Sequence, residues 1–145
     1  MFGEDLILGY KKCKVDEKHR IFLPKFSFSE KGDFVVISEG DNGVLLLNSI
    51  VALKQRIANI EKSINSNEQM KSLELLYLKL ERLYASCLAT SKVDSQKRLL
   101  IPDDVYDKHS IGSSVILQGC GDHLKLFNSE ETHNQYVRKL NNSRI

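Results

Sequence analysis

The sequence contains one pattern twice, and this internal repeat restricts the possible folds more than any other feature. Val15–Pro24 and Val93–Pro102 both read Val-Asp, three variable residues, Arg, three large apolar residues and Pro, at a spacing of 78 residues. A second match follows each copy, because Val35–Ile37 corresponds to Val115–Leu117. Repetition at a fixed spacing indicates a chain built from two similar structural units.

Each half has the pattern of a small β unit. One strand is expected to end at the motif Asp, and a short strand to run from the motif Arg to the Pro, which cannot continue a central ladder. In the first half, strands over 34–38 and 44–47 flank the segment 39–43, whose glycines and Asn-Gly pair suit positive φ angles. The segment 119–123 is the corresponding turn of the second half.

Helical sequence lies between the halves. Apolar residues recur at spacings of three and four over 50–64 and again over 73–87, which places each set on one face of a helix. The polar segment 65–67 separates them, so we expect an antiparallel helical hairpin whose apolar faces meet each other or the β units. Asn-Ser pairs predict N-caps at Ser49 and Ser129, the second for a C-terminal helix.

These patterns divide the chain into four parts. The prediction is a first half over 1–49, a helical hairpin over 50–88, a second half over 89–140 and a tail over 141–145. Each β unit alone would leave strand edges open, and interlocking the two halves removes those edges. We therefore expect an α+β fold, mainly β, in which the interlocked halves form one closed barrel with an inserted helical hairpin.

Length and cysteine content fit a single core without cross-links. A chain of 145 residues buries enough surface to fold without a metal or a disulfide. Cys13, Cys87 and Cys120 are an odd and scattered set, which predicts free thiols in a reducing compartment.

Positive charge concentrates at the first copy of the motif. The chain has a net charge of +2, but Lys11–Lys25 holds six basic and two acidic residues, a local net charge of +4. The equivalent segment Ala89–Asp103 has a net charge of only +1. A basic segment suits a polyanion such as DNA, although most charge runs only form a solvated surface.

The Asp and Arg of each motif admit two interpretations. The Asp can accept hydrogen bonds from the amides of its own turn, and an Arg on a rigid strand can contact phosphate or bind guanine with two hydrogen bonds. Alternatively, Asp16 with Arg20, and Asp94 with Arg98, only form pairs within each turn. From the motif alone this structural interpretation is favoured, because such pairs are common.

Membrane, metal and catalytic functions have little support. No stretch approaches the roughly 18 apolar residues of a membrane span, and Met1–Asp5 lacks the features of a secretory signal, so we expect a cytoplasmic protein without a membrane partner. Cys120 and His123 have a Cys-x-x-His spacing, but a structural zinc site needs four ligands. We predict no enzyme, no metal and no cofactor.

The tandem motif and the helical insert together resemble the MraZ family, bacterial transcriptional regulators built from two swapped-hairpin halves of the AbrB/SpoVT type. The likeness runs from about Phe2 to about Leu140 and includes the start Met1–Gly3. Family members commonly have Gly before the motif Arg, where this chain has His19 and Lys97. The resemblance therefore leaves the shape of the two turns open. Members also have a Trp after the second hairpin, and here Phe127 lies nearby.

The resemblance implies a partner and an assembly. It implies binding of double-stranded DNA at repeated promoter elements upstream of the division and cell wall gene cluster, a nucleoid location and a ring-shaped homo-oligomer. With the repeat and the resemblance combined, Asp16 and Asp94 are expected to organise the turns. The predicted DNA-binding residues are Arg20, Lys18, His19, Lys14, Lys12, Arg98 and Lys97.

Two questions stay open at this stage. Arg98 either contacts DNA or only completes the barrel. The alternative function is a protein-interaction scaffold of the same fold, in which His19 and Lys97 in place of glycine have abolished DNA binding.

Overall fold

The structure is a computed structural model that describes residues 6–28, 34–66 and 70–143. The predicted start at Met1–Gly3 and the last two residues of the predicted tail lie outside these ranges. Within the described ranges the chain has eight strands and four α-helices, which confirms the predicted α+β class.

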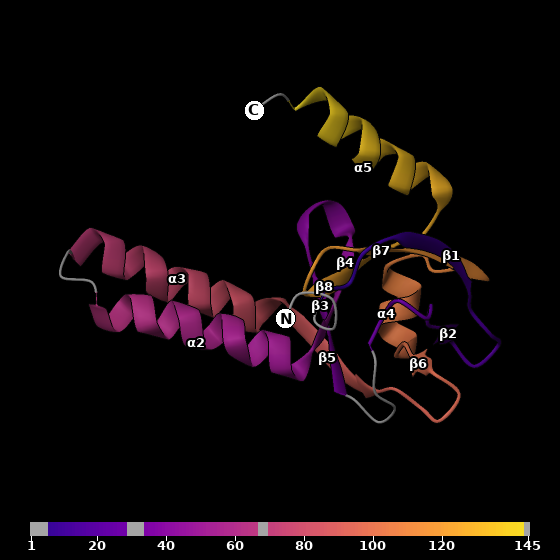
Figure 1. Cartoon of the computed structure of the whole chain (residues 1–145), viewed down its shortest axis with the longest axis horizontal. Helices are drawn as coiled ribbons and strands as arrows, with labels where there is room; N and C mark the ends of the chain where they lie inside the picture. Colours follow the sequence, from indigo (N-terminus) through magenta and orange to yellow (C-terminus); the bar gives the residue numbers. More distant parts are fainter. Residues whose placement is uncertain (1–5, 29–33, 67–69, 144–145) are drawn as a thin grey trace.

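Six strands form one antiparallel sheet that interleaves the two halves (Figure 1). Its order is β1 (Tyr10–Lys14), β7 (Ser114–Gly119), β8 (His123–Phe127), β4 (Leu45–Ser49), β3 (Phe34–Glu39) and β5 (Cys87–Lys92). The first strand of each half therefore pairs with the hairpin of the other half. Lys12 lies opposite Ile116, and Val36 opposite Thr90. This exchange of strands confirms that the halves interlock.

A second, two-stranded sheet pairs the short motif strands β2 (Arg20–Phe22) and β6 (Arg98–Leu100). Tight turns connect these strands to β1 and β5, the two edges of the larger sheet, at one end of the molecule (Figure 1). Among the described residues no strand pairing joins β1 to β5, so a closed barrel stays a prediction.

One hydrophobic core draws on both halves. Its members are the inward-facing residues of the strands, and the motif strands contribute one residue each, Ile21 and Leu99, which lie opposite one another. Because both side chains are fully buried, the two-stranded sheet is fixed to the core at its centre. Other fully buried members are Val35, Ile37, Leu45, Leu47, Val93, Ile101, Leu117 and Leu124.

The helical hairpin consists of α2 (Ile50–Ser66) and α3 (Met70–Ser86), which project side by side from the sheet (Figure 1). The hairpin was predicted correctly, but both boundaries differ. Cys87 and Leu88 belong to β5 rather than to the helix, because Cys87 pairs with Ser38 of β3. At the other boundary, α2 extends through Ser66, into the segment predicted as its polar break.

Two further helices follow the second motif and the second hairpin, α4 (Asp103–Lys108) and α5 (Glu130–Asn142). Ser129 caps α5 by accepting a hydrogen bond from the amide of Thr132, and Ser49 accepts the equivalent bond from Ala52 at 3.1 Å, as predicted. The tail predicted from Asn141 onwards is wrong for its first two residues, because α5 continues through Asn142.

The inner side of α5 packs on the second hairpin. Phe127 is buried, with its ring centroid 5.0 Å from those of His133 and Tyr136. Phe127 thus fills the space between the second hairpin and α5. Of the helices in the described ranges, none combines the length and the apolar character needed to cross a bilayer.

Candidate nucleic-acid interface

The first motif turn is organised by one carboxylate. Oδ1 of Asp16 accepts hydrogen bonds from the amides of Lys18 and Arg20 at 3.0 and 2.9 Å. Oδ2 accepts a bond from Nε of Arg20 at 2.7 Å. The carboxylate therefore fixes the backbone of the turn and the direction of the Arg20 side chain at the same time.

The second turn has the same geometry. Oδ1 of Asp94 accepts from the amides of Gln96 and Arg98 at 2.9 and 2.8 Å, and Oδ2 accepts from Nε of Arg98 at 2.8 Å. The pairing within each turn that the structural interpretation requires is thus present in both copies. This pairing uses Nε, and among residues 6–28, 34–66 and 70–143 no partner bonds to the two Nη groups of either Arg.

Both carboxylates are stabilised in the charged form. Partial burial raises the pKa of Asp16, but the amide and guanidinium of Arg20 and the amide of Lys18 outweigh it, so the pKa lies below its ordinary value. The pKa of Asp94 is lowered in the same way, chiefly by the amide and guanidinium of Arg98. The two Asp–Arg pairs are therefore ionised at neutral pH.

The residue before each Arg has a left-handed backbone. His19 has φ = 63° and Lys97 has φ = 59°, a region that glycine adopts most easily. Each of these residues also bonds to the other half, because the amide of Ile101 donates to the carbonyl of His19 and the amide of Leu23 to that of Lys97. The two turns are therefore alike in shape, although neither has glycine at this position.

The side chain of His19 ties the first turn to α4. Its ring stacks on Tyr106 at 3.6 Å between centroids, with an angle of 5° between the planes. Its Nδ1 donates to Oδ1 of Asp103 at 2.8 Å. Neither partner was predictable from local sequence patterns, because both contacts join residues more than 80 positions apart.

The outer face of the two-stranded sheet carries both motif arginines. Side chains alternate along a strand, so Arg20 and Phe22 point outward while Ile21 points into the core. By the same rule Arg98 and Leu100 point outward, and the pairing places Arg20 beside Leu100 and Phe22 beside Arg98. We call these four side chains the outer quartet. The two arginines of the quartet were predicted as site residues, but its two apolar members were not, although side-chain alternation within each three-residue run indicates them.

The predicted basic residues do not all gather at this surface. Lys18 and His19 lie within the first turn. Lys97 lies within the second turn, where its Nζ donates to the carbonyl of Lys25 at 3.2 Å. Lys14 is exposed on β1. Lys12 instead forms an ion pair with Glu130 in the first turn of α5, at 3.2 Å, so its charge is directed at α5 rather than at the motif turns.

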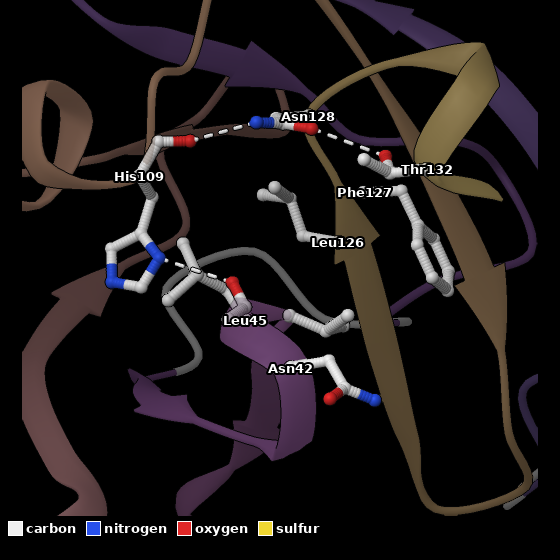
Figure 2. A pocket seen from close by; sticks show the side chains of 9 residues that line it. Asn42, Leu45, His109, Leu126, Phe127, Asn128 and Thr132 are labelled. Carbon is white, nitrogen blue, oxygen red and sulfur yellow. Dashed lines mark hydrogen bonds between the residues drawn. The ribbon is translucent and has the colours of Figure 1, made fainter. Parts of the chain in front are cut away.

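A small cavity of about 80 Å³ lies where the two halves meet (Figure 2). His109 donates through Nδ1 to the carbonyl of Gly43, and Asn128 donates to the carbonyl of His109, both at 3.1 Å. Thr132 donates to Asn128 at 3.1 Å. These bonds connect the turn between β3 and β4 to α4 and α5. The cavity therefore belongs to a structural contact between the halves and is separate from the candidate site.

The Cys-x-x-His segment forms a hairpin turn that is tied to α2. Arg56 donates to both carboxylate oxygens of Asp122, at 2.6 and 3.2 Å, and Nδ1 of His123 lies 2.8 Å from the same carboxylate. In the part of the chain that the structure describes, no group of three or more His, Cys, Asp or Glu side chains is placed to hold a metal ion.

The fold and this surface define a class of protein. Two interlocked β halves, each with an Asp-x-x-x-Arg turn, make a tandem swapped-hairpin protein with a pair of fixed arginines on one outer face. Searches of sequence-family models give no match. Similar proteins include "Transcriptional regulator MraZ" of Mycoplasmoides gallisepticum, 30% identical over 90% of this chain and 88% of the relative.

The corresponding protein of Bifidobacterium longum, also named "Transcriptional regulator MraZ", is 25% identical over 92% of this chain and 85% of the relative. On the evidence of these full-length similarities, the chain belongs to the MraZ family. A solution structure of PHS018 from Pyrococcus horikoshii covers 87% of this chain and 98% of its own at 18% identity, but with a TM-score of 0.37. The fold of this chain is therefore defined by its own strand pairing.

Proposed function

We propose that this protein is a transcriptional regulator that binds double-stranded DNA sequence-specifically through its two Asp-x-x-x-Arg turns. Its targets would be repeated promoter elements upstream of the division and cell wall gene cluster, and it would act in the cytoplasm at the nucleoid. The names of the similar proteins support a regulatory role. The basic segment around the first turn supports DNA as the partner.

One observation carries the proposal: within the described ranges, each motif Arg bonds to its own Asp through Nε and makes no bond through its Nη groups. Recognition of guanine by Arg uses two parallel N–H donors directed at O6 and N7. An arginine that is fixed through Nε and free at both Nη groups has those donors in a defined position before binding. Less side-chain freedom is then lost on binding than for an unrestrained arginine or lysine.

The scaffold alternative depends on disturbed turns at His19 and Lys97. Both residues adopt the left-handed conformation that glycine would have, and both turns keep the same set of hydrogen bonds. The geometry therefore gives no reason to favour a scaffold without DNA binding.

A homo-oligomer, in the form of a ring, is part of the proposal. Linked copies of a weak DNA site gain roughly 10²–10⁴ in avidity on repeated elements. Exposed apolar side chains on two helices, Leu75 and Leu78 of α3 and Leu140 of α5, support contacts between copies. Size-exclusion chromatography with light scattering measures the number of subunits, and a monomer at micromolar concentration would contradict this part.

The DNA-binding proposal is tested by fluorescence anisotropy with DNA from upstream of the gene and a scrambled duplex of equal length. We expect the wild type to prefer the upstream DNA, and Arg20→Lys to lose about tenfold or more of this preference, because lysine cannot form the bidentate contact. Arg20→Ala should also reduce the salt slope by about 1.

The matched control is Lys54→Ala, which removes one positive charge from the exposed face of α2, away from the turns. Circular dichroism checks that each variant is folded. Equal binding of both duplexes by the wild type, or an equal effect of Lys54→Ala and Arg20→Ala, would refute the proposal.

A further inference from the structure

The outer quartet combines charge with exposed apolar surface. Phe22 and Leu100 are 39% and 49% exposed, although both are strand residues with core-type side chains. Each lies directly across the ladder from a motif arginine, Phe22 from Arg98 and Leu100 from Arg20. The guanidinium of Arg98 lies 6.0 Å from the ring centroid of Phe22. The structural role of the motif strands is already fulfilled by the buried Ile21 and Leu99, so it does not account for the outward pair.

The quartet has an approximate two-fold symmetry. Its axis passes between Ile21 and Leu99, the central pair of the ladder, and exchanges the Arg20–Leu100 pair with the Arg98–Phe22 pair. A B-DNA duplex also has two-fold axes that pass through its grooves. A two-stranded antiparallel ribbon is narrow enough to enter the major groove, which is about 12 Å wide.

The major groove offers a partner for each type of side chain in the quartet. Guanine presents two acceptors that match Arg, and thymine presents the C5-methyl group, the apolar feature that distinguishes it there. An exposed apolar side chain beside an arginine is therefore matched by a thymine beside a guanine. A membrane or an apolar protein surface would not match the two arginines, which flank the apolar pair diagonally.

We propose that Phe22 and Leu100 are specificity-determining residues that contact thymine methyl groups in the major groove. This inference rests on the proposed DNA-binding function and adds to it a source of base discrimination separate from the arginines. Burial of one methyl group corresponds to about a fourfold change in affinity, and two methyl groups to about fifteenfold.

The first test compares the upstream duplex with the same duplex synthesised with uracil in place of every thymine. The two differ only by the methyl groups. Native protein is expected to bind the thymine duplex about fifteenfold more tightly in an anisotropy competition at fixed salt. This measurement uses no variant, so a folding defect cannot affect it. Equal affinity for the two duplexes would overturn the inference.

The second test assigns the discrimination to the two residues. The thymine-to-uracil ratio is the affinity for the thymine duplex divided by the affinity for the uracil duplex. In the double variant Phe22→Ala/Leu100→Ala we expect this ratio to fall to about one, while the preference for guanine at the bases that the arginines contact is retained. Val51→Ala truncates an exposed apolar side chain on α2, a helix with no role in the proposal, and should leave the ratio unchanged. A double variant that keeps the wild-type ratio would show that the methyl groups act through DNA shape, and would overturn the assignment.

The outcomes separate this inference from the DNA-binding proposal. If native protein prefers upstream over scrambled DNA through Arg20 but does not distinguish thymine from uracil, the regulator proposal stands and this inference fails. If the double variant changes the number of subunits in light scattering while the thymine-to-uracil ratio persists, the pair is an interface between copies, and the inference fails as well.

Discussion

Replacing Lys97 by glycine and replacing His19 by glycine should change stability in opposite directions, although the two positions are equivalent in the repeat. Both residues have a left-handed backbone, with φ of 59° and 63°. Glycine relieves about 1–2 kcal/mol of steric cost in this conformation. It also adds about 0.4–1 kcal/mol of conformational entropy to the unfolded chain. The net gain from the backbone alone is therefore about 0.8 kcal/mol at either position.

The side chains decide the sign. Within the part of the chain that the structure describes, the side chain of Lys97 makes one exposed hydrogen bond, to the carbonyl of Lys25. Its loss removes only a few tenths of a kcal/mol, so Lys97→Gly should stabilise the protein by about 0.5 kcal/mol. His19 stacks on Tyr106 and bonds to Asp103. Loss of the stack costs about 1 kcal/mol and loss of the bond about 0.5–1 kcal/mol, so His19→Gly should destabilise by about 1 kcal/mol.

Differential scanning calorimetry measures both effects. The unfolding entropy of a 145-residue chain is about 0.3 kcal/mol/K, so we expect Tm to rise by about 2 °C in Lys97→Gly and to fall by about 3 °C in His19→Gly. Tyr106→Ala in combination with His19→Gly tests the cause, because the two changes should be less than additive. A fall in Tm for Lys97→Gly, or a rise for His19→Gly, would refute the argument.

Three further predictions concern the packing and the titration of the fold. A Cβ at Gly119 would lie 2.5 Å from the carbonyl oxygen of Ile7, whereas a Cβ at Gly112 would meet nothing within 4 Å. In urea unfolding, Gly119→Ala should therefore lower the free energy of unfolding by about 2–3 kcal/mol and Gly112→Ala should not lower it. Equal effects of the two variants would contradict this. The lowered pKa of Asp94 stabilises the folded state fully above the pKa of an unfolded aspartate, about 3.9, and this stabilisation is lost as pH falls through the folded pKa. In a plot of unfolding free energy against pH, Asp94→Asn should therefore make the acid side less steep. An unchanged acid side would argue against this role of Asp94. Burial raises the pKa of all three cysteine thiols, but Cys13 is only 3% exposed, whereas Cys87 and Cys120 are partly exposed. Cys13 should therefore react with Ellman's reagent more slowly than the other two, and three equal rates would count against the packing.

The repeat made the strands and the exchange between halves predictable. The motif predicted where β2 and β6 begin, because the Arg is the first residue of each strand, but both strands end two residues before the Pro to which they were expected to run. The need to remove strand edges implied that the halves interlock. Local spacing could not predict which strands pair, and this caused the error at Cys87, where a helical apolar spacing continues into a residue that pairs with β3.

Other features depend on contacts that sequence patterns do not contain. The glycine-rich turn after β3 was expected to have positive φ at its glycines, and Asn42 and Gly43 do, but Gly40 has φ = −98°. The turn needs only two left-handed residues to reverse the chain. The local distribution of charge also did not predict the ion pair of Lys12 with Glu130, because its partners are 118 positions apart.

The two turns differ in their surroundings although their Asp–Arg hydrogen bonds are the same, and the covalent link between the halves explains this difference. In a symmetric dimer of single halves, any substitution would alter both turns at once. In one chain, His19 can bond to α4 while the side chain of Lys97 bonds to the backbone carbonyl of Lys25, and the basic segment can surround the first turn alone. The Asp–Arg geometry is the same to within about 0.1 Å in the two copies. The arginines differ in exposure, with 28% for the side chain of Arg20 and 17% for Arg98. A difference in DNA affinity between Arg20→Ala and Arg98→Ala would therefore measure the surroundings of the two arginines, because the turns themselves are alike.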